Sequence, residues 1–305
     1  MFVYYKYYCY ICIVKVKQVI TIKNKNYMEN FTYTKGLQKL GCTYLGGVKH
    51  SSKMMYSYNK GTLTYCLYLA PSTMAYGNKT TCPNDKYCKD LCLNSAGRNR
   101  VDILHNGIEN SKINISRIKK TKLFYEDRET FMQLLVHEIK LAQNKAKKMN
   151  LEFSIRLNGT SDLSLLTFKL GGKNILEIFN DVQFYDYSKV FSRFKNFYHS
   201  KYKNYDITFS YNGYNWNECE EVLKMGGKVA IVFESNVIPK TFNGYNIENG
   251  NEDDMRYLNS SSSIIYLHYH RTANDYVIDE KTNKRKYIAP NTPFIIKKDD
   301  KRCEY

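Results

Sequence analysis

Six short runs rich in β-branched and aromatic residues recur along the chain, and they restrict the fold more than any other feature. The runs are TLTYCLYLA at 62–70, FSIRLN at 153–158, VQFYDY at 182–187, ITFSYN at 207–212, VAIVFE at 229–234 and IIYLHYH at 264–270. Such runs favour strands, and a block that is apolar throughout, such as VAIVF, is typical of a strand covered on both faces. The chain therefore contains about six strands, of which at least one lies inside a sheet.

Helix-like segments separate these runs. The clearest is 127–149, where apolar residues recur at helical spacing and lysines gather at the C-terminal end. A shorter helix is expected at 215–227, with a Gly-Gly stop signal, and weaker candidates lie at 164–178 and 189–201. Strands that alternate with helices predict an α/β fold with a mostly parallel sheet. We expect a partial (β/α) barrel of about six strands.

The same pattern predicts one large domain with additions at both ends. We expect an irregular N-terminal extension at 1–40, of which residues 1–27 are an appendage or the product of an upstream start. A single barrel-like domain follows at 41–271, with a Cys-rich loop at 71–100. Residues 272–305 form a polar tail, which we expect to be a peripheral hairpin or loop. The longest lysine-free run near the N-terminus, Tyr7–Val14, is too short to span a bilayer, so no membrane partner is expected.

Charge and cysteine usage suggest the environment and the partner. The formal net charge is +17, which attracts phosphate polymers, so a nucleotide or nucleic acid is the expected partner. Lys119, Lys120 and Lys122 in the basic run RIKKTK are candidate contacts to a nucleic-acid backbone, although such a run can also be a solvated helix face. Nine cysteines, an odd number, point to a reducing cytoplasm rather than a disulfide framework.

Several enzyme classes lose support because their motifs are missing. The sequence has no Walker A motif, no G-x-G-x-x-G and no G-x-S-x-G, and its six histidines show no H-E-x-x-H spacing. These absences weigh against an NTPase, a Rossmann dehydrogenase and a serine hydrolase.

Polar residues gather where the predicted strands end, which is where barrel enzymes place their sites. The candidates are Arg156, Asn158, Asp162, Asp186 and Lys189. Arg156 could hold an anion or a carboxylate, whereas Ser161 or Asp162 could simply cap the next helix. Asp186 and Lys189 could form a charged pair over the barrel mouth or belong to a solvated turn.

A further acidic segment leaves two interpretations open. Asp253, Asp254 and Arg256 in NEDDMRY are expected to begin a helix, with a metal site as the alternative.

Three cysteines lie close together in the loop after the first strand, at Cys82, Cys88 and Cys92. Three thiolates without a nearby fourth suit a [4Fe–4S] cluster with one open iron, which can bind a small molecule such as S-adenosylmethionine. A structural zinc is the alternative, with His105, Cys66 or Cys42 as fourth ligand. The third possibility is that the three thiols bind no metal. Cys66 and Cys219 are expected in the core.

The strings TCPNDKYCKDLCLNSAGRNR, RLNGTSDL, VQFYDYSK, ITFSYNGYNW and VAIVF, in this order, resemble the gene product 88 family of phages and large DNA viruses. The resemblance runs from about residue 40 to residue 270. It implies no particular activity, and for a viral protein the location would be the host cytoplasm. Within the family pattern the five polar strand-end residues match, so they carry over as candidate site residues without assigned roles.

The cysteine loop and strand pattern are also distantly similar to radical S-adenosylmethionine barrels. The spacing differs, because that superfamily uses C-x3-C-x2-C, whereas the gaps here are five and three residues. NGTSD also occupies the place of the Gly-Gly-Glu stretch after the second strand. We therefore expect an iron–sulfur enzyme acting on a nucleotide or nucleic-acid-related substrate, or else a zinc-stabilised basic nucleic-acid-binding protein without catalysis.

Overall fold

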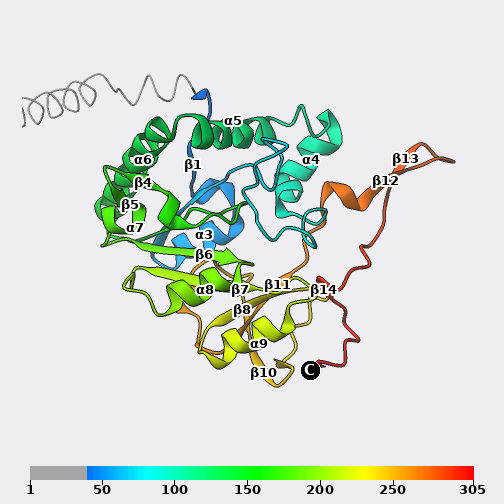
Figure 1. Ribbon diagram of the computed structural model, residues 1–305. Helices are drawn as coiled ribbons and strands as arrows, with labels where there is room; N and C mark the ends of the chain where they lie inside the picture. Colours follow the sequence, from blue (N-terminus) through cyan, green and yellow to red (C-terminus); the bar gives the residue numbers. More distant parts are fainter. Residues whose placement is uncertain (1–39) are drawn as a thin grey trace, which may run out of the picture. The chain divides into compact units, whose positions relative to one another are not determined.

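The computed structural model describes residues 40–305 (Figure 1). The predictions for residues 1–27, and nearly all of the extension predicted at 1–40, lie outside the described residues. Residues 43–305 form one compact unit. Within residues 40–305, every helix is too short or too polar to cross a membrane.

A mostly parallel sheet is the centre of this unit and confirms the predicted α/β class. Its parallel strands, in spatial order, are β2 (Thr62–Leu67), β3 (Glu152–Arg156), β6 (Gln183–Ser188), β7 (Tyr205–Ser210), β8 (Lys228–Phe233), β11 (Ile264–His268) and β10 (Tyr245–Asn249). Antiparallel strands extend both edges: β1 (Leu45–Gly46) pairs with β2, β9 (Thr241–Phe242) with β10, and β15 (Cys303–Glu304) with β9. The first six of the parallel strands are the six runs predicted from the sequence, and they are neighbours in chain order. The hydrogen-bonded path stays open from β1 to β15, so no closed barrel is formed by the described residues.

Helices connect most of these strands. They are α3 (Ser52–Asn59), α4 (Gly97–Asn106), α5 (Lys112–Glu126), α6 (Arg128–Lys148), α7 (Ile175–Ile178), α8 (Phe191–Tyr198) and α9 (Trp216–Lys224). Short 3₁₀ turns are η1 (Val48–His50), η2 (Leu93–Ser95), η3 (Leu165–Thr167), η4 (Arg256–Leu258) and η5 (Ala273–Asp275). Helix α6 matches the clearest predicted helix, because the Asp127 carboxylate accepts from the Thr130 N–H at its start and lysines occupy its last turn.

The segment 164–178, expected as a weak helix, is mostly not helical. It forms η3, the small hairpin of β4 (Lys169–Leu170) and β5 (Lys173–Asn174), and the one-turn helix α7. Gly171 and Gly172 have positive φ angles of 57° and 81°, a conformation that glycine adopts readily and that turns the chain between β4 and β5. The two glycines therefore end the helical pattern.

Residues 272–305, expected as a polar tail with a peripheral hairpin or loop, contain a hairpin and also contribute a strand to the sheet. A two-stranded hairpin, β12 (Tyr276–Asp279) with β13 (Lys284–Tyr287), extends beside α4 (Figure 1). The chain then returns, and β14 (Ile295–Ile296) pairs in parallel with β8. The buried run Phe294–Ile296 explains this return, because burying three large apolar side chains stabilises the docked segment.

Helix α3 and the segment after β10 meet although they lie far apart in the sequence. The Lys53 ammonium donates to the Gly250 carbonyl at 2.8 Å, and the Lys60 ammonium lies 2.7 Å from the Asp253 carboxylate. Helix α3 also packs against β2, which follows it in the chain. The residues that follow β10 therefore contact the helix that precedes β2.

Candidate functional site

Asn158 organises the loop that follows β3. Its backbone N–H and its side-chain Nδ2 donate to the two carboxylate oxygens of Asp186, at 2.9 and 3.0 Å. Its Oδ1 accepts from the Ser161 hydroxyl and the Leu163 N–H, each at 2.9 Å. Asn158 is 2% exposed. Its amide group is thus engaged inside the protein and acts by shaping the loop.

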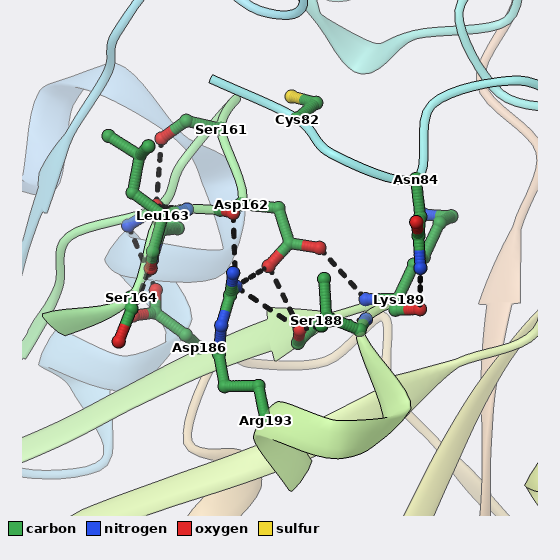
Figure 2. Close-up of polar contacts among 12 residues, drawn as sticks. Cys82, Asn84, Ser161, Asp162, Leu163, Ser164, Asp186, Ser188, Lys189 and Arg193 are labelled. Carbon is green, nitrogen blue, oxygen red and sulfur yellow. Dashed lines mark hydrogen bonds and ion pairs between the residues drawn. The ribbon is translucent and has the colours of Figure 1, made fainter. Parts of the chain in front are cut away.

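Asp162 joins this loop to the start of α8 (Figure 2). Its carboxylate accepts from the Ser188 hydroxyl at 2.9 Å and from the Lys189 backbone N–H at 2.9 Å, and it pairs with the Arg193 guanidinium. These partners come from the end of β6, from the residue directly after it and from α8. Asp162 therefore stabilises the start of α8, which follows β6, and does not cap a helix directly after its own loop.

Asp186 and Lys189 contact different partners. Asp186 is buried and bonded to Asn158, while the Lys189 ammonium lies 5.7 Å from the centre of the Phe294 ring. Burial raises the pKa of Asp186 to about 7, although the nearby Arg156 charge and the hydrogen bonds from Asn158 oppose the rise. Asp186 can therefore gain or lose a proton near neutral pH.

Arg156 lies on the same face of the sheet as Cys66 of β2 and Tyr187 of β6, and we call this face the inner face. Arg156 is paired in register with Cys66, and its Nε donates to the Asn158 carbonyl at 3.1 Å. The guanidinium carbon lies 4.6 Å from the centre of the Tyr187 ring, and NH1 lies 3.9 Å from the Asp254 carboxylate. Burial lowers the pKa of Arg156, but Asp254, Cys66, Tyr187 and Asp186 raise it, and together they make the net shift upward. Arg156 is thus a permanent cation on the inner face, at the carboxyl end of β3.

The cysteine loop connects β2 to α4, on the side of the sheet where β3 and β6 end. Cys82, Cys88 and Cys92 are all free thiols. The Cys82 sulfur accepts from the Ser72 N–H at 3.4 Å, and the Cys92 sulfur accepts from the Asn94 N–H at 3.4 Å. Burial raises the pKa of Cys82 to about 11, the Ser72 N–H opposes this rise, and the neighbouring Cys92 adds to it.

In this structure the three thiols are not arranged around a common point where a metal ion could bind. Among residues 40–305, no three side chains of His, Cys, Asp or Glu are placed so as to hold a metal ion. This holds as well for Asp253 and Asp254, which lie just before the 3₁₀ helix η4, whose first residue is Arg256.

A family model for gene product 88 matches residues 36–288, which is most of the chain. The chain belongs to the gene product 88 family. The matched range takes in the main parallel sheet, the cysteine loop and the β12–β13 hairpin, and it ends before β14. No curated protein and no solved structure gives a significant match. The distant similarity to radical S-adenosylmethionine barrels therefore has no support from the comparisons.

In this gene product 88 family member, the three lysines predicted to contact nucleic acid divide into two groups. Lys119 and Lys122 of α5 are exposed. Lys120 is 5% exposed, and its ammonium donates to the backbone carbonyls of Tyr44 at 3.3 Å and Thr43 at 3.4 Å. Only Lys119 and Lys122 are placed to meet a partner in solution.

The sequence reasoning missed a residue of this gene product 88 chain that the fold brings close to Arg156. Lys53 lies on α3, in the unremarkable string SSKMMYSYN. It is separated from Arg156, Asp254 and Arg256 by more than a hundred positions, and no local motif marks it. Only the packing of α3 on the sheet reveals it.

Proposed function

We propose that this family member is an iron–sulfur protein in which Cys82, Cys88 and Cys92 hold a [4Fe–4S] cluster beside the carboxyl ends of the strands. The observation that supports this most is the set of three free thiols on one loop, two of which accept backbone N–H groups. Such N–H···S bonds stabilise thiolate charge and are among the features that tune iron–sulfur centres. The alternative with zinc needs a fourth ligand from elsewhere.

The chemistry of the donors fits this cluster, while their present arrangement requires the loop to close. Burial raises the pKa of Cys82, so without metal it is a thiol, and binding iron would replace its proton. Residues 82–92 form a succession of turns rather than a helix or strand, so closing moves the loop and leaves the sheet in place. A cluster with three cysteine ligands would supply one iron that can bind a small molecule, such as S-adenosylmethionine.

The partial (β/α) barrel belongs to the same proposal. In a flat sheet β2 and β10 would stand about 29 Å apart, because six strand spacings of roughly 4.8 Å separate them. Yet α3, which packs on β2, contacts the segment that follows β10 through Lys53 and Lys60. A sheet that curls around α3 accounts for both contacts. The carboxyl ends of its strands would then converge, as they do at the mouth of a barrel.

For a substrate we propose a nucleotide or a nucleic-acid-related molecule. The net charge of +17 favours a phosphate-bearing partner, and Arg156 supplies a permanent cation near the strand ends. Asn158, Asp162 and Asp186 would act by holding the loop in position. We assign no reaction step to them.

Metal analysis of anaerobically purified protein tests the proposal. We expect a brown protein with broad visible absorption and about four irons per chain. Cys88→Ala should lose the iron and the colour, whereas Cys303→Ala, which changes a thiol on β15, should keep both. A colourless protein with one zinc would overturn the iron–sulfur proposal in favour of the zinc-stabilised alternative.

The exposure of Lys119 and Lys122 favours a second candidate, a zinc-stabilised basic protein that binds nucleic acid without catalysis. Binding of a labelled duplex should then weaken steeply with salt and should weaken further in a Lys119→Met, Lys122→Met double variant. Affinity that stays constant between low and moderate salt would exclude a contact driven by phosphate charges.

A further inference from the structure

Three cations from three different elements converge on the inner face of the sheet. Lys53 of α3 donates to the Gly250 carbonyl at 2.8 Å. Arg256 of η4 lies against the same glycine, since a Cβ added to Gly250 would stand 2.8 Å from the Arg256 NH1 atom. Arg156 of β3 approaches through Asp254, at 3.9 Å. We call Lys53, Arg156, Arg256 and Asp254 the inner cluster.

The charges of the inner cluster act on one another, as the pKa of Lys53 shows. Burial lowers the pKa of Lys53 to about 8; Asp254 opposes the shift, and Arg256 and Arg156 add to it. Burial also lowers the pKa of His270, and Lys53 contributes to that shift. Asp253 pairs with Arg256 and also opposes the shift of Lys53, so three cations face two carboxylates here.

Several buried nitrogen atoms in this region have no hydrogen-bond partner. Arg256 is 1% exposed, and its NH2 donates to the Asp253 carbonyl and carboxylate, but its Nε and NH1 have no partner. The buried Nδ1 of His268 has none either. Asp254 already accepts from the Tyr185 hydroxyl at 3.3 Å. Buried donors without a partner are rare in native proteins, and they indicate a site that takes up an acceptor.

The inner face also carries buried threonine hydroxyl groups. The Oγ1 atoms of Thr64 and Thr208 are buried and without hydrogen-bond partners. The strand registers place both on the same face of the sheet as Arg156, because Cys66, two positions after Thr64, pairs with Arg156, and Thr208 pairs with Tyr187. Such hydroxyl groups suit a ligand with several oxygen atoms.

We propose that the inner cluster binds the oxyanion group, a carboxylate or a phosphate, of a small ligand on the inner face of the sheet. Lys53, Arg156 and Arg256 supply the charge and the donors, and Asp254 orients Arg156. The ligand is small because Arg256 and Asp254 are buried and α3 packs beside them, which excludes a nucleic-acid chain. This site goes beyond the iron–sulfur proposal and stands without it.

Binding of simple oxyanions to the full chain tests the site. Isothermal calorimetry and thermal unfolding would use inorganic phosphate in one arm and succinate in the other, each against chloride at equal ionic strength. The arm that binds identifies the oxyanion as phosphate or carboxylate. Lys53→Met should weaken that binding at least tenfold. Lys49→Met, which removes an exposed lysine of η1, should leave it unchanged.

Two further variants keep the outcome decisive. Lys53→Gln keeps a donor for the Gly250 carbonyl, so it should fold if the methionine variant does not, and it too should bind at least tenfold more weakly. Cys88→Ala should bind the oxyanion as the unmodified protein does, which separates this site from the metal proposal. No binding in either arm, or equal binding by the Lys53 variants, would overturn the inference.

Discussion

Asp186 accepts two hydrogen bonds from a single residue, Asn158, which lies on the neighbouring strand's loop: one from the backbone N–H at 2.9 Å and one from Nδ2 at 3.0 Å. Both residues are buried. The pair fastens the loop after β3 to β6 through a single carboxyl group, and we expect this attachment to respond to pH.

The pKa of Asp186 leads to a prediction about stability and pH. Its pKa is raised to about 7 in the folded protein and is about 3.9 in the unfolded chain. Between these values the folded state binds a proton that the unfolded state does not, so this group makes the free energy of unfolding fall as pH rises. The loss reaches about 2 to 4 kcal/mol above pH ~7.

Asp186→Asn removes this dependence and still offers an oxygen to the Asn158 N–H. Urea unfolding of both proteins at several pH values between the two pKa values would measure it. We expect the unmodified protein to lose stability relative to the variant as pH rises across this range. A constant difference between the two proteins would show that Asp186 does not titrate there.

Gly159 leads to a steric prediction. A Cβ at this position would lie 2.6 Å from the Cys66 sulfur and 2.6 Å from the Tyr68 ring, so Gly159→Ala should reduce the free energy of unfolding by about 2 to 4 kcal/mol. Gly77→Ala is the matched control, since a Cβ there meets nothing within 4 Å. Thermal unfolding of both variants checks this. Equal melting temperatures would mean that the loop after β3 moves away at little cost.

Adjacent lysines on α5 should behave differently. Lys120→Met leaves two backbone carbonyls without their ammonium donor, which should cost about 1 to 3 kcal/mol. Lys119→Met changes an exposed side chain and should alter stability by less than about 0.5 kcal/mol. Denaturant unfolding measures both. A destabilised Lys119 variant and an unchanged Lys120 variant would contradict the assignment.

Local periodicity was enough to predict the strands and the two clearest helices. The six runs became β2, β3, β6, β7, β8 and β11, and the segments at 127–149 and 215–227 became α6 and α9. Each of these signals is contained in a short window. Their parallel pairing followed from the alternation of strand and helix types.

The site was less accessible, because its contacts join distant parts of the chain. Lys53 and Gly250 are 197 positions apart, and no sequence pattern near either residue predicts that the two meet. Lys120 shows the same difficulty. The run RIKKTK has the composition of a solvated helix face, yet the Lys120 ammonium is buried and donates to the Tyr44 carbonyl. Burial of individual side chains is set by tertiary packing.

The contact between α3 and the segment after β10 also has a consequence for how the protein is made. Lys53 and Lys60 emerge from the ribosome early, whereas Gly250 and Asp253 are synthesised when most of the chain has already been translated. Contacts between residues so distant in sequence form late and slow the folding of a domain. We therefore expect Lys53 to meet Gly250, and the inner cluster to assemble, late in folding.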